Sequence, residues 1–111
     1  LDDRVNKCIA AGIKRNSIII DPGFGFGKTV SDNLVLLKNL RTFSELKIPI
    51  CIGLSRKSFI GEVTHRSIDQ RVSGSLSAAL IAIQNGANII RTHDVGPTKD
   101  AIEIHNSLQR V

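Results

Sequence analysis

The feature that most constrains this chain is a set of three short apolar runs, each of which ends abruptly in polar or charged residues. The runs cover residues 17–20, 50–52 and 88–90, with helical patterns before and after each one. This spacing is typical of βα units, whose strands are parallel and whose crossovers are right-handed. Uninterrupted apolar strands also indicate that both faces of the sheet are covered. The sequence therefore predicts an α/β fold with the order α-β-α-β-α-β-α.

The number of strands narrows the architecture. An eight-stranded βα barrel requires about 250 residues, whereas this chain has 111. We therefore expect residues 1–111 to be the C-terminal part of a (β/α)8 TIM barrel, about three and a half βα units with parallel strands. An open flavodoxin-like or Rossmann-like sheet is the alternative on pattern alone. The initial Leu1 and the lack of methionine suggest an excerpt from a longer polypeptide, with the N-terminal half absent.

Helical periodicity and capping signals set the expected helices. Ser31 is the expected cap of the second helix, and Ser67 with Gln70 has capping-box spacing for the third, which Gly86 ends. Residues 60–66 are predicted to be a polar connection. The positions expected to face inward are Val5, Cys8, Ile9, Leu36, Leu37, Leu40, Phe43, Val72, Leu76, Ala79, Leu80, Ile83, Ala101, Ile104, Leu108 and Val111.

Composition excludes several classes of function. The net charge is +5, but the basic residues are scattered along the predicted helices and only 4% of residues are aromatic, so a nucleic-acid groove with stacking platforms is poorly supported. No apolar stretch approaches the roughly 20 residues that cross a bilayer, and no signal peptide is evident. Cys8 and Cys51 lack metal-ligand spacing and are expected to be reduced packing residues of a cytoplasmic protein.

The string Gly25-Phe26-Gly27-Lys28-Thr29 invites a nucleotide-binding interpretation, which its spacing contradicts. A phosphate-binding P-loop requires a glycine five residues before Gly27, where this chain has Pro22. Proline lacks a backbone N–H and fixes φ, so it cannot serve in a phosphate cradle. No G-x-G-x-x-G dinucleotide fingerprint is present either.

Asp21 directly follows the first apolar run. Its carboxylate can accept two parallel hydrogen bonds from a guanidine-like edge, such as the amino-pyrimidine of a pterin or guanine. The alternative is an aspartate that accepts hydrogen bonds from the amides of its own turn.

Ser55, Arg56 and Lys57 place a hydroxyl and two cations after the second run, where Lys57 can donate to a ring carbonyl and the other two can meet a carboxylate or second substrate. A basic, solvated helix start is the alternative, although cations are mildly unfavourable there.

Arg91 and His93 follow the third run two residues apart, so their side chains emerge on one face if the chain stays extended. A guanidinium can stack on an aromatic ring, and both side chains can bind phosphate oxygens. His65 and His105 are expected to be surface residues, and Asp94 is expected to orient a neighbour or to cap a helix. Because ligands of βα sheets bind beyond the carboxyl ends of the strands, these residues together predict a site for an anionic, heteroaromatic ligand.

Three segments, in this order and spacing, resemble the C-terminal half of the dihydropteroate synthase family. They are Asp21-Pro22-Gly23-Phe24-Gly25-Phe26-Gly27-Lys28, Gly53-Leu54-Ser55-Arg56-Lys57-Ser58 and Arg91-Thr92-His93-Asp94-Val95, with Gly74-Ser75-Leu76-Ser77-Ala78-Ala79 matching the helix after the family's mobile seventh loop. The resemblance implies a barrel enzyme, a transferase of folate biosynthesis. Such an enzyme joins 6-hydroxymethyl-7,8-dihydropterin pyrophosphate to p-aminobenzoate, giving 7,8-dihydropteroate and pyrophosphate.

The resemblance also implies roles for individual residues. Lys57, Arg91 and His93 would be catalytic, and the substrate-binding residues would be Asp21, Gly25, Phe26, Gly53, Ser55, Arg56, Lys57, Arg91 and His93. Asp21 would hold the pterin's amino-pyrimidine edge, while Phe26, Ser55 and Arg56 would border the p-aminobenzoate pocket, where sulfonamides compete.

Mg²⁺ assists departure of pyrophosphate in the family, and its principal ligand is expected in the missing N-terminal half, so no metal ligand is assigned here. The full-length protein is expected to be a homodimer with no nucleic-acid or membrane partner, and the fragment alone is expected to be inactive. A pterin-binding methyltetrahydrofolate-dependent methyltransferase and a non-catalytic half-barrel subunit are the competing functions.

Overall fold

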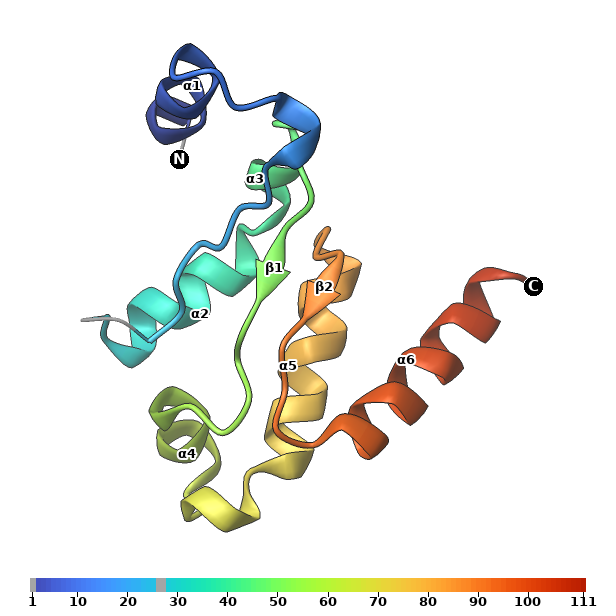
Figure 1. The fold of residues 1–111 in the computed structure, drawn as a ribbon. Coiled ribbons are helices and arrows are strands. Elements are labelled where there is room, and N and C mark those ends of the chain that lie inside the picture. Colours follow the sequence, from blue (N-terminus) through green and yellow to red (C-terminus); the bar gives the residue numbers. More distant parts are fainter. Residues whose placement is uncertain (1, 26–27) are drawn as a thin grey trace.

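A narrow parallel sheet organises the molecule (Figure 1). Strand β1 (Cys51–Ile52) pairs in parallel with β2 (Ile89–Ile90). On the opposite edge of β1, Ile20 forms a parallel bridge with Ile50, through hydrogen bonds of 2.9 Å from the Ile20 amide to the Pro49 carbonyl and 2.8 Å from the Cys51 amide to the Ile20 carbonyl. The predicted parallel order of the three segments is confirmed.

The structure is a computed structural model that describes residues 2–25 and 28–111. Helices precede, separate and follow the strands, as predicted. The helical elements in chain order are α1 (Asp2–Ala10), the 3₁₀ turn η1 (Arg15–Ser17), α2 (Val30–Lys38), α3 (Arg41–Ser44), α4 (Ser58–Thr64), the 3₁₀ turn η2 (Ile68–Gln70), α5 (Val72–Gln84) and α6 (Val95–Gln109).

One face of the sheet carries the core. Alternate positions along the strands, among them Ile20, Ile50 and Ile52, are buried beneath the helices. On the other face, Ile19 is 57% and Ile89 is 39% exposed. The expectation that both faces are covered is therefore wrong for the residues that the structure describes, because three strands leave open the side that a closed barrel fills with its own opposite strands.

The strands are shorter than predicted. The first apolar run was expected to be a strand from Ser17 to Ile20, but Ser17 ends η1 and only Ile20 makes a ladder contact. Local hydrogen bonds replace strand pairing at Ser17 and Ile18, because the amides of these two residues donate to the carbonyls of Lys14 and Arg15. The ladders are short because pairing is confined to Ile20 at the end of the first run, to residues 50–52 of the second run and to residues 89–90 of the third.

The cap of α2 lies two residues before the predicted one. Thr29, not Ser31, accepts a hydrogen bond from the amide of Asp32, whose carboxylate accepts one in return from the amide of Thr29. Ser67 and Gln70 do not form the predicted capping box, because the Ser67 hydroxyl points to the side chains of Asp69 and Gln70 and no backbone amide reaches it. Side-chain hydrogen bonds of this local kind compete directly with capping.

Residues 60–66 are not the predicted polar connection, since most of them belong to α4. Phe59, Ile60 and Gly61 are buried, and the ring of Phe59 stacks on Phe24 with centroids 6.3 Å apart. Phe59, Ile60 and Val63 form a short apolar face on this helix. The polar residues around them hide the helical pattern in the sequence.

Helix α5 approaches the core through small side chains. Its buried residues are Ser75, Ala78, Ala79 and Ala82. Of the residues predicted to face inward, only Ala79 is buried, whereas Val72, Leu76, Leu80 and Ile83 are half-buried at the flanks. Small residues on the central line let the helix lie close to α4 and the sheet.

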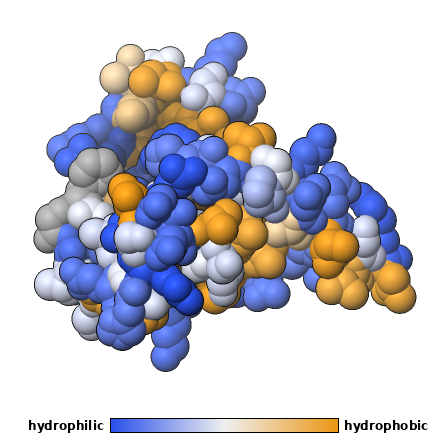
Figure 2. Space-filling view, turned by 90° about the horizontal axis from the view of Figure 1, so that it is seen from below, coloured by the Kyte–Doolittle hydropathy of each residue, from blue (hydrophilic) through white to orange (hydrophobic). Residues whose placement is uncertain are grey.

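Helix α6 packs against α5 but projects from the body of the molecule (Figure 1). Its predicted inner positions Ile104 and Leu108 are 67% and 68% exposed, and Figure 2 shows hydrophobic side chains gathered on this projecting part. The radius of gyration is 14.9 Å, larger than the ≈ 13 Å of a compact domain of about 100 residues. The described chain is thus an open piece of α/β structure.

A glycine at the contact of α4 with α5 provides a test of this packing. A Cβ on Gly74 would lie 2.6 Å from Cγ2 of buried Ile60, whereas a Cβ on Gly96 in α6 meets nothing within 4 Å. We expect Gly74→Ala to lower the free energy of unfolding, since overpacking costs about 1–3 kcal/mol and outweighs a helix-propensity gain of at most about 1 kcal/mol. Gly96→Ala is the control and is expected to be neutral or stabilising. Urea unfolding followed by circular dichroism measures both, and a Gly74→Ala variant as stable as the control contradicts the packing.

Candidate functional site

The carboxyl ends of β1 and β2 open into a pocket of about 270 Å³. It is lined by Gly53, Ser55, Lys57, Arg91, Thr92 and His93. The parallel pairing brings these residues together. The Arg91 amide donates to the Ile52 carbonyl at 2.8 Å, and this hydrogen bond fixes where the segments after β1 and β2 leave the sheet. Every residue of the lining except Thr92 is among the predicted site residues.

Asp21 is not in the pocket lining, but its side chain contacts Arg91, which is. Its Oδ2 lies 3.3 Å from NH2 of Arg91, and both side chains are exposed, so this ion pair contributes little to stability by itself. Its Oδ1 accepts a hydrogen bond of 2.9 Å from the Gly23 amide. The turn-forming role left open by the sequence is therefore present, and the second oxygen still faces the site.

The Arg91 guanidinium lies directly over the backbone of Gly53. A Cβ at Gly53 would come within 2.5 Å of Arg91 NH2, so any larger residue at this position displaces the guanidinium. The planar cation at the mouth of the pocket therefore depends on a glycine at the end of β1.

Lys57 reaches across the site from the turn after β1. Its ammonium donates to the Phe24 carbonyl, and its aliphatic stem passes Gly25, where a Cβ would lie 3.2 Å from Lys57 Cδ. Burial lowers the pKa of Lys57, and the opposite charge of Asp21 partly offsets this shift. Charge repulsion from Arg91 and Lys28 lowers the pKa of Lys57 further. The site thus holds an excess of positive charge.

Ser55 and His93 form one hydrogen-bonded unit. Ser55 Oγ accepts a hydrogen bond of 3.1 Å from the His93 amide and lies 3.0 Å from His93 Nδ1. Because Oγ already accepts a hydrogen bond from the His93 amide, the serine hydroxyl can direct its own proton to Nδ1 when that nitrogen carries no proton. This arrangement leaves Nε2–H as the donor of neutral His93, which suits an anionic oxygen.

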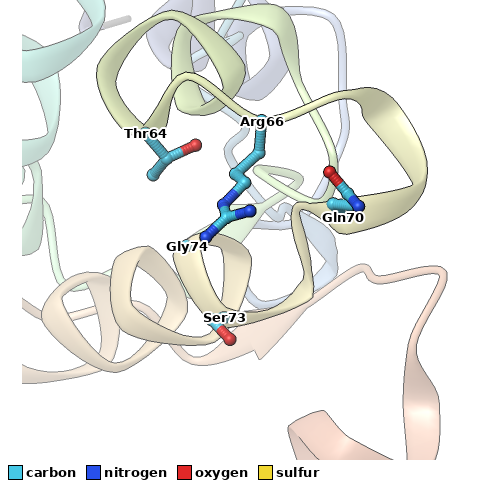
Figure 3. Close-up of a pocket in the computed structure, with 5 residues that line it drawn as sticks. All are labelled: Thr64, Arg66, Gln70, Ser73 and Gly74. Atoms are coloured by element: carbon cyan, nitrogen blue, oxygen red, sulfur yellow. The ribbon is translucent and has the colours of Figure 1, made fainter.

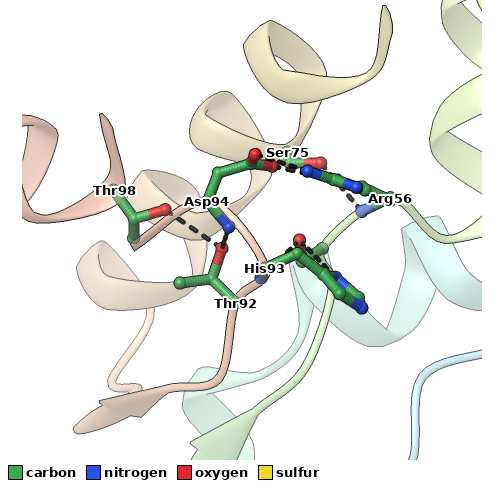
Figure 4. A network of polar contacts seen from close by, with 7 residues as sticks. Arg56, Ser75, Thr92, His93, Asp94 and Thr98 are labelled. Carbon is green, nitrogen blue, oxygen red and sulfur yellow. Dashed lines mark hydrogen bonds and ion pairs between the residues drawn. The ribbon is translucent and has the colours of Figure 1, made fainter. Parts of the chain in front are cut away.

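Arg56 is turned toward Asp94 and is not part of the pocket lining (Figure 4). The contact is bidentate, with Nε to Oδ2 at 3.2 Å and NH2 to Oδ1 at 2.7 Å. This hydrogen bond and the opposite charge raise the pKa of Arg56, and the guanidinium lowers the pKa of Asp94. Asp94 therefore orients a neighbour, as predicted. Its side chain does not cap α6, although its carbonyl accepts the Thr98 amide.

The backbone of Arg56 is left-handed, with φ of 57°. It is the third residue of a turn closed by a hydrogen bond of 3.2 Å from the Lys57 amide to the Leu54 carbonyl. Glycine is favoured at a positive φ in such turns, and a side chain there costs about 1–2 kcal/mol. The Arg56 amide donates to Oγ of buried Ser75 at 2.9 Å, which helps to hold this conformation (Figure 4).

The segment after β2 is fixed by a second set of hydroxyl contacts. Thr92 Oγ1 accepts the Asp94 amide at 3.1 Å and lies 3.1 Å from Oγ1 of buried Thr98 (Figure 4). Thr92 and Ser75 are site-supporting residues that sequence reasoning missed. A serine on the inner side of an apolar helix was the available signal for Ser75.

Two predicted site residues stand apart from this geometry. Gly25 has φ of 88° and contacts Lys57, but it is not in the pocket lining. Phe26, predicted to border the second substrate, lies outside the described residues.

A pocket of about 320 Å³ lies elsewhere, between the end of α4 and the start of α5 (Figure 3). It is lined by Thr64, Arg66, Gln70, Ser73 and Gly74. None of these residues was predicted to belong to a site, and the converging strand ends lie at the other pocket.

Residues 2–25 and 28–111 lack two features that would point to other kinds of function. Within these residues, no three or more His, Cys, Asp and Glu side chains are grouped so as to hold a metal ion. None of the helices in the same part of the chain combines the length and hydrophobicity needed to cross a membrane.

The charges around Lys57 predict how it titrates. Asp21→Asn removes an anion that stabilises the ammonium, so the pKa of Lys57 is expected to fall further below its ordinary value. Arg91→Gln removes a repelling cation, so this pKa is expected to rise. Nuclear magnetic resonance of labelled lysine side chains follows both titrations. A Lys57 resonance that titrates identically in the two variants contradicts the described geometry.

Among known proteins, the chain is similar to dihydropteroate synthases. The chain is 50% identical over 104 residues to a dihydropteroate synthase from Haemophilus influenzae, a match that covers 94% of this chain and 38% of the relative. It is 43% identical over 102 residues to the dihydropteroate synthase of Escherichia coli, covering 92% of this chain and 36% of that protein. The chain thus spans well under half the length of these relatives.

Solved structures of dihydropteroate synthases superpose on nearly the whole chain. A dihydropteroate synthase from Xanthomonas albilineans in complex with 7,8-dihydropteroate superposes with a TM-score of 0.97 at 46% identity, covering 99% of this chain and 42% of that one. The Yersinia pestis enzyme with a sulfonamide drug superposes with a TM-score of 0.94 at 40% identity, covering 98% of this chain and 40% of that one. The predicted fold class is confirmed: the chain is part of a (β/α)8 barrel.

The family model described as "Pterin binding enzyme" matches residues 1–93, which include the whole pocket lining. Together with a fold shared over nearly the entire chain, this match shows that the chain belongs to the pterin-binding enzyme family.

Proposed function

We propose that this chain is the part of a dihydropteroate synthase that holds the pterin and its diphosphate. The observation that carries the proposal is the pocket at the ends of β1 and β2, where Lys57, Arg91 and His93 converge on one cavity. The names of the relatives support the same activity. The reaction joins 6-hydroxymethyl-7,8-dihydropterin pyrophosphate to p-aminobenzoate and releases pyrophosphate.

Asp21 and Lys57 are the proposed pterin contacts. Oδ2 of Asp21 can accept N–H groups from the amino-pyrimidine edge, and the Lys57 ammonium can donate to the ring carbonyl or a ring nitrogen. Both groups would exchange existing partners for the ligand, because Asp21 now contacts Arg91 and Lys57 now donates to Phe24.

Arg91 and His93 are the proposed diphosphate contacts. The Arg91 guanidinium can stack on the pterin ring while its N–H groups bind phosphate oxygens. Nε2–H of His93 adds a donor, since Ser55 occupies Nδ1. The net effect is to stabilise the negative charge that gathers on pyrophosphate as it departs.

The chemistry needs no nucleophile from the protein. The bond between the pterin methylene carbon and the pyrophosphate oxygen breaks, and its electron pair leaves with pyrophosphate. The aniline nitrogen of p-aminobenzoate forms the new bond to that carbon and then loses its proton to solvent. Stabilisation of the leaving group and orientation of the amine therefore supply the rate enhancement.

Mg²⁺ would neutralise pyrophosphate charge, and we propose that its principal ligand lies outside these 111 residues. Phe26, Ser55 and Arg56 remain the proposed border of the p-aminobenzoate site, where sulfonamides would compete. Arg56 is now paired with Asp94, so a contact with the substrate carboxylate requires that it share or exchange this partner.

We also propose a homodimer for the full-length protein and a cytoplasmic location. The location is supported by the two free cysteines, Cys8 and Cys51.

A methyltetrahydrofolate-dependent methyltransferase would use a similar pterin site without a diphosphate. The cluster of cations favours the synthase, because a methyl donor has no pyrophosphate to neutralise. A non-catalytic half-barrel subunit would bind neither substrate.

Loss of the diphosphate contacts is the direct test. In the full-length protein, we expect Arg91→Ala combined with His93→Ala to weaken binding of the pterin pyrophosphate by about a hundredfold or more, because charged hydrogen bonds to phosphate are each worth about 1.5–3 kcal/mol. Isothermal titration calorimetry measures this affinity, and 6-hydroxymethyl-7,8-dihydropterin without pyrophosphate is the control ligand, whose affinity should fall far less. Equal losses for both ligands contradict a diphosphate-binding role.

The isolated 111-residue chain is expected to have little or no synthase activity, since one face of its sheet lies open. A coupled assay for pyrophosphate release compares it with an intact synthase. Turnover comparable to that of the intact enzyme refutes this expectation.

A further inference from the structure

Arg71, which directly precedes α5, holds two backbone carbonyls on the chain leading to it. Its NH1 donates to the Arg56 carbonyl at 3.0 Å, and its Nε donates to the Arg66 carbonyl at 3.1 Å. The guanidinium lies against Gly61, where a Cβ would come within 2.3 Å of Arg71 NH2. Arg71 thus ties the turn after β1 to the far end of α4.

The amide, the carbonyl and the guanidinium of Arg56 each have a partner outside the turn that contains this residue. The amide donates to Ser75 Oγ at 2.9 Å, the carbonyl accepts from Arg71, and the guanidinium pairs with Asp94. A positive φ is unfavourable for Arg56, because this residue carries a side chain. The contacts from outside the turn therefore decide whether the turn keeps its shape.

The turn matters because the residues on both sides of Arg56 line the pocket. Ser55 reaches His93 by two contacts, and Lys57 crosses to the Phe24 carbonyl. A change in the Arg56 backbone redirects the peptide on each side of it. Both pocket residues would then move away from their present partners.

We propose that Arg71 and Ser75 are positioning residues, which hold Arg56 in its left-handed turn and thereby aim Ser55 and Lys57 into the ligand pocket. Neither residue is in the pocket lining. This inference rests on the proposed function in one respect, because its kinetic test measures KM for the pterin pyrophosphate. Its structural readout, the contact of Ser55 with His93, does not depend on the identity of the substrate.

The kinetic test uses Arg71→Gln and Ser75→Ala in the full-length protein, with Ser77→Ala, an exposed serine on the same helix, as the matched control. Each positioning variant is expected to raise KM for the pterin pyrophosphate about tenfold, because loss of a partly buried hydrogen-bond partner of Arg56 reduces the fraction of molecules with the competent turn. Ser77→Ala is expected to stay within about twofold. A KM unchanged in both positioning variants overturns the proposal.

The Arg56→Gly background separates positioning from general stability. Glycine adopts a positive φ without external support, so Arg71→Gln is expected to raise KM by less than about threefold relative to Arg56→Gly alone. An equal rise in both backgrounds overturns the proposal, because Arg71 then acts independently of the turn. Arg71→Lys replaces Arg71→Gln throughout if the latter does not fold.

Nitrogen chemical shifts of His93 give a readout without substrate. In the unaltered protein, Nδ1 is expected to show the shift of an acceptor from Ser55, and Arg71→Gln and Ser75→Ala are expected to shift it toward the value of an exposed imidazole. Identical His93 shifts in these variants and in Ser77→Ala overturn the positioning role. If the unaltered protein forms no dihydropteroate, the proposed function fails, and the His93 shifts still decide the present inference.

Discussion

The hydrogen bonds that β1 makes on both of its edges are the constraint on which the site depends. They join the Ile20 segment to one edge and β2 to the other, with all three running in the same direction. Side chains that follow these segments in the sequence are forced to one end of the sheet. Asp21, Lys57 and Arg91 meet there although they are far apart along the chain. Without this parallel pairing, no local feature would bring their charges together.

The site holds more positive than negative charge, because Lys57 and Arg91 lie together near the carboxylate of Asp21. The carboxylate of Asp94 pairs with Arg56, which is not part of the pocket lining. Burial and repulsion lower the pKa of Lys57, so binding of an anion would relieve an unfavourable arrangement. This unbalanced charge is the physical reason for proposing a diphosphate as the ligand.

Supporting contacts come from elements remote from the chemistry. Ser75 and Arg71 fix the turn after β1, and Thr92 and Thr98 fix the segment after β2. Their role is visible only in three dimensions, because a serine or threonine in a helix pattern carries no mark of its partner. The apolar faces left open on the sheet and on α6 reflect the same dependence on tertiary context, since the rest of a barrel would cover the sheet's inner face.

The order of helices and strands followed from hydrophobic spacing, and the pocket residues Lys57, Arg91 and His93 followed from their places just after apolar runs. Both are local properties of the chain, so the sequence by itself determined them. Only the tertiary structure decided that Thr29 caps α2, that 60–66 is mostly helical, that Arg56 faces Asp94, and that small residues of α5 face the core. Each of these outcomes depends on competition among contacts or on partners distant in sequence, and periodicity contains neither.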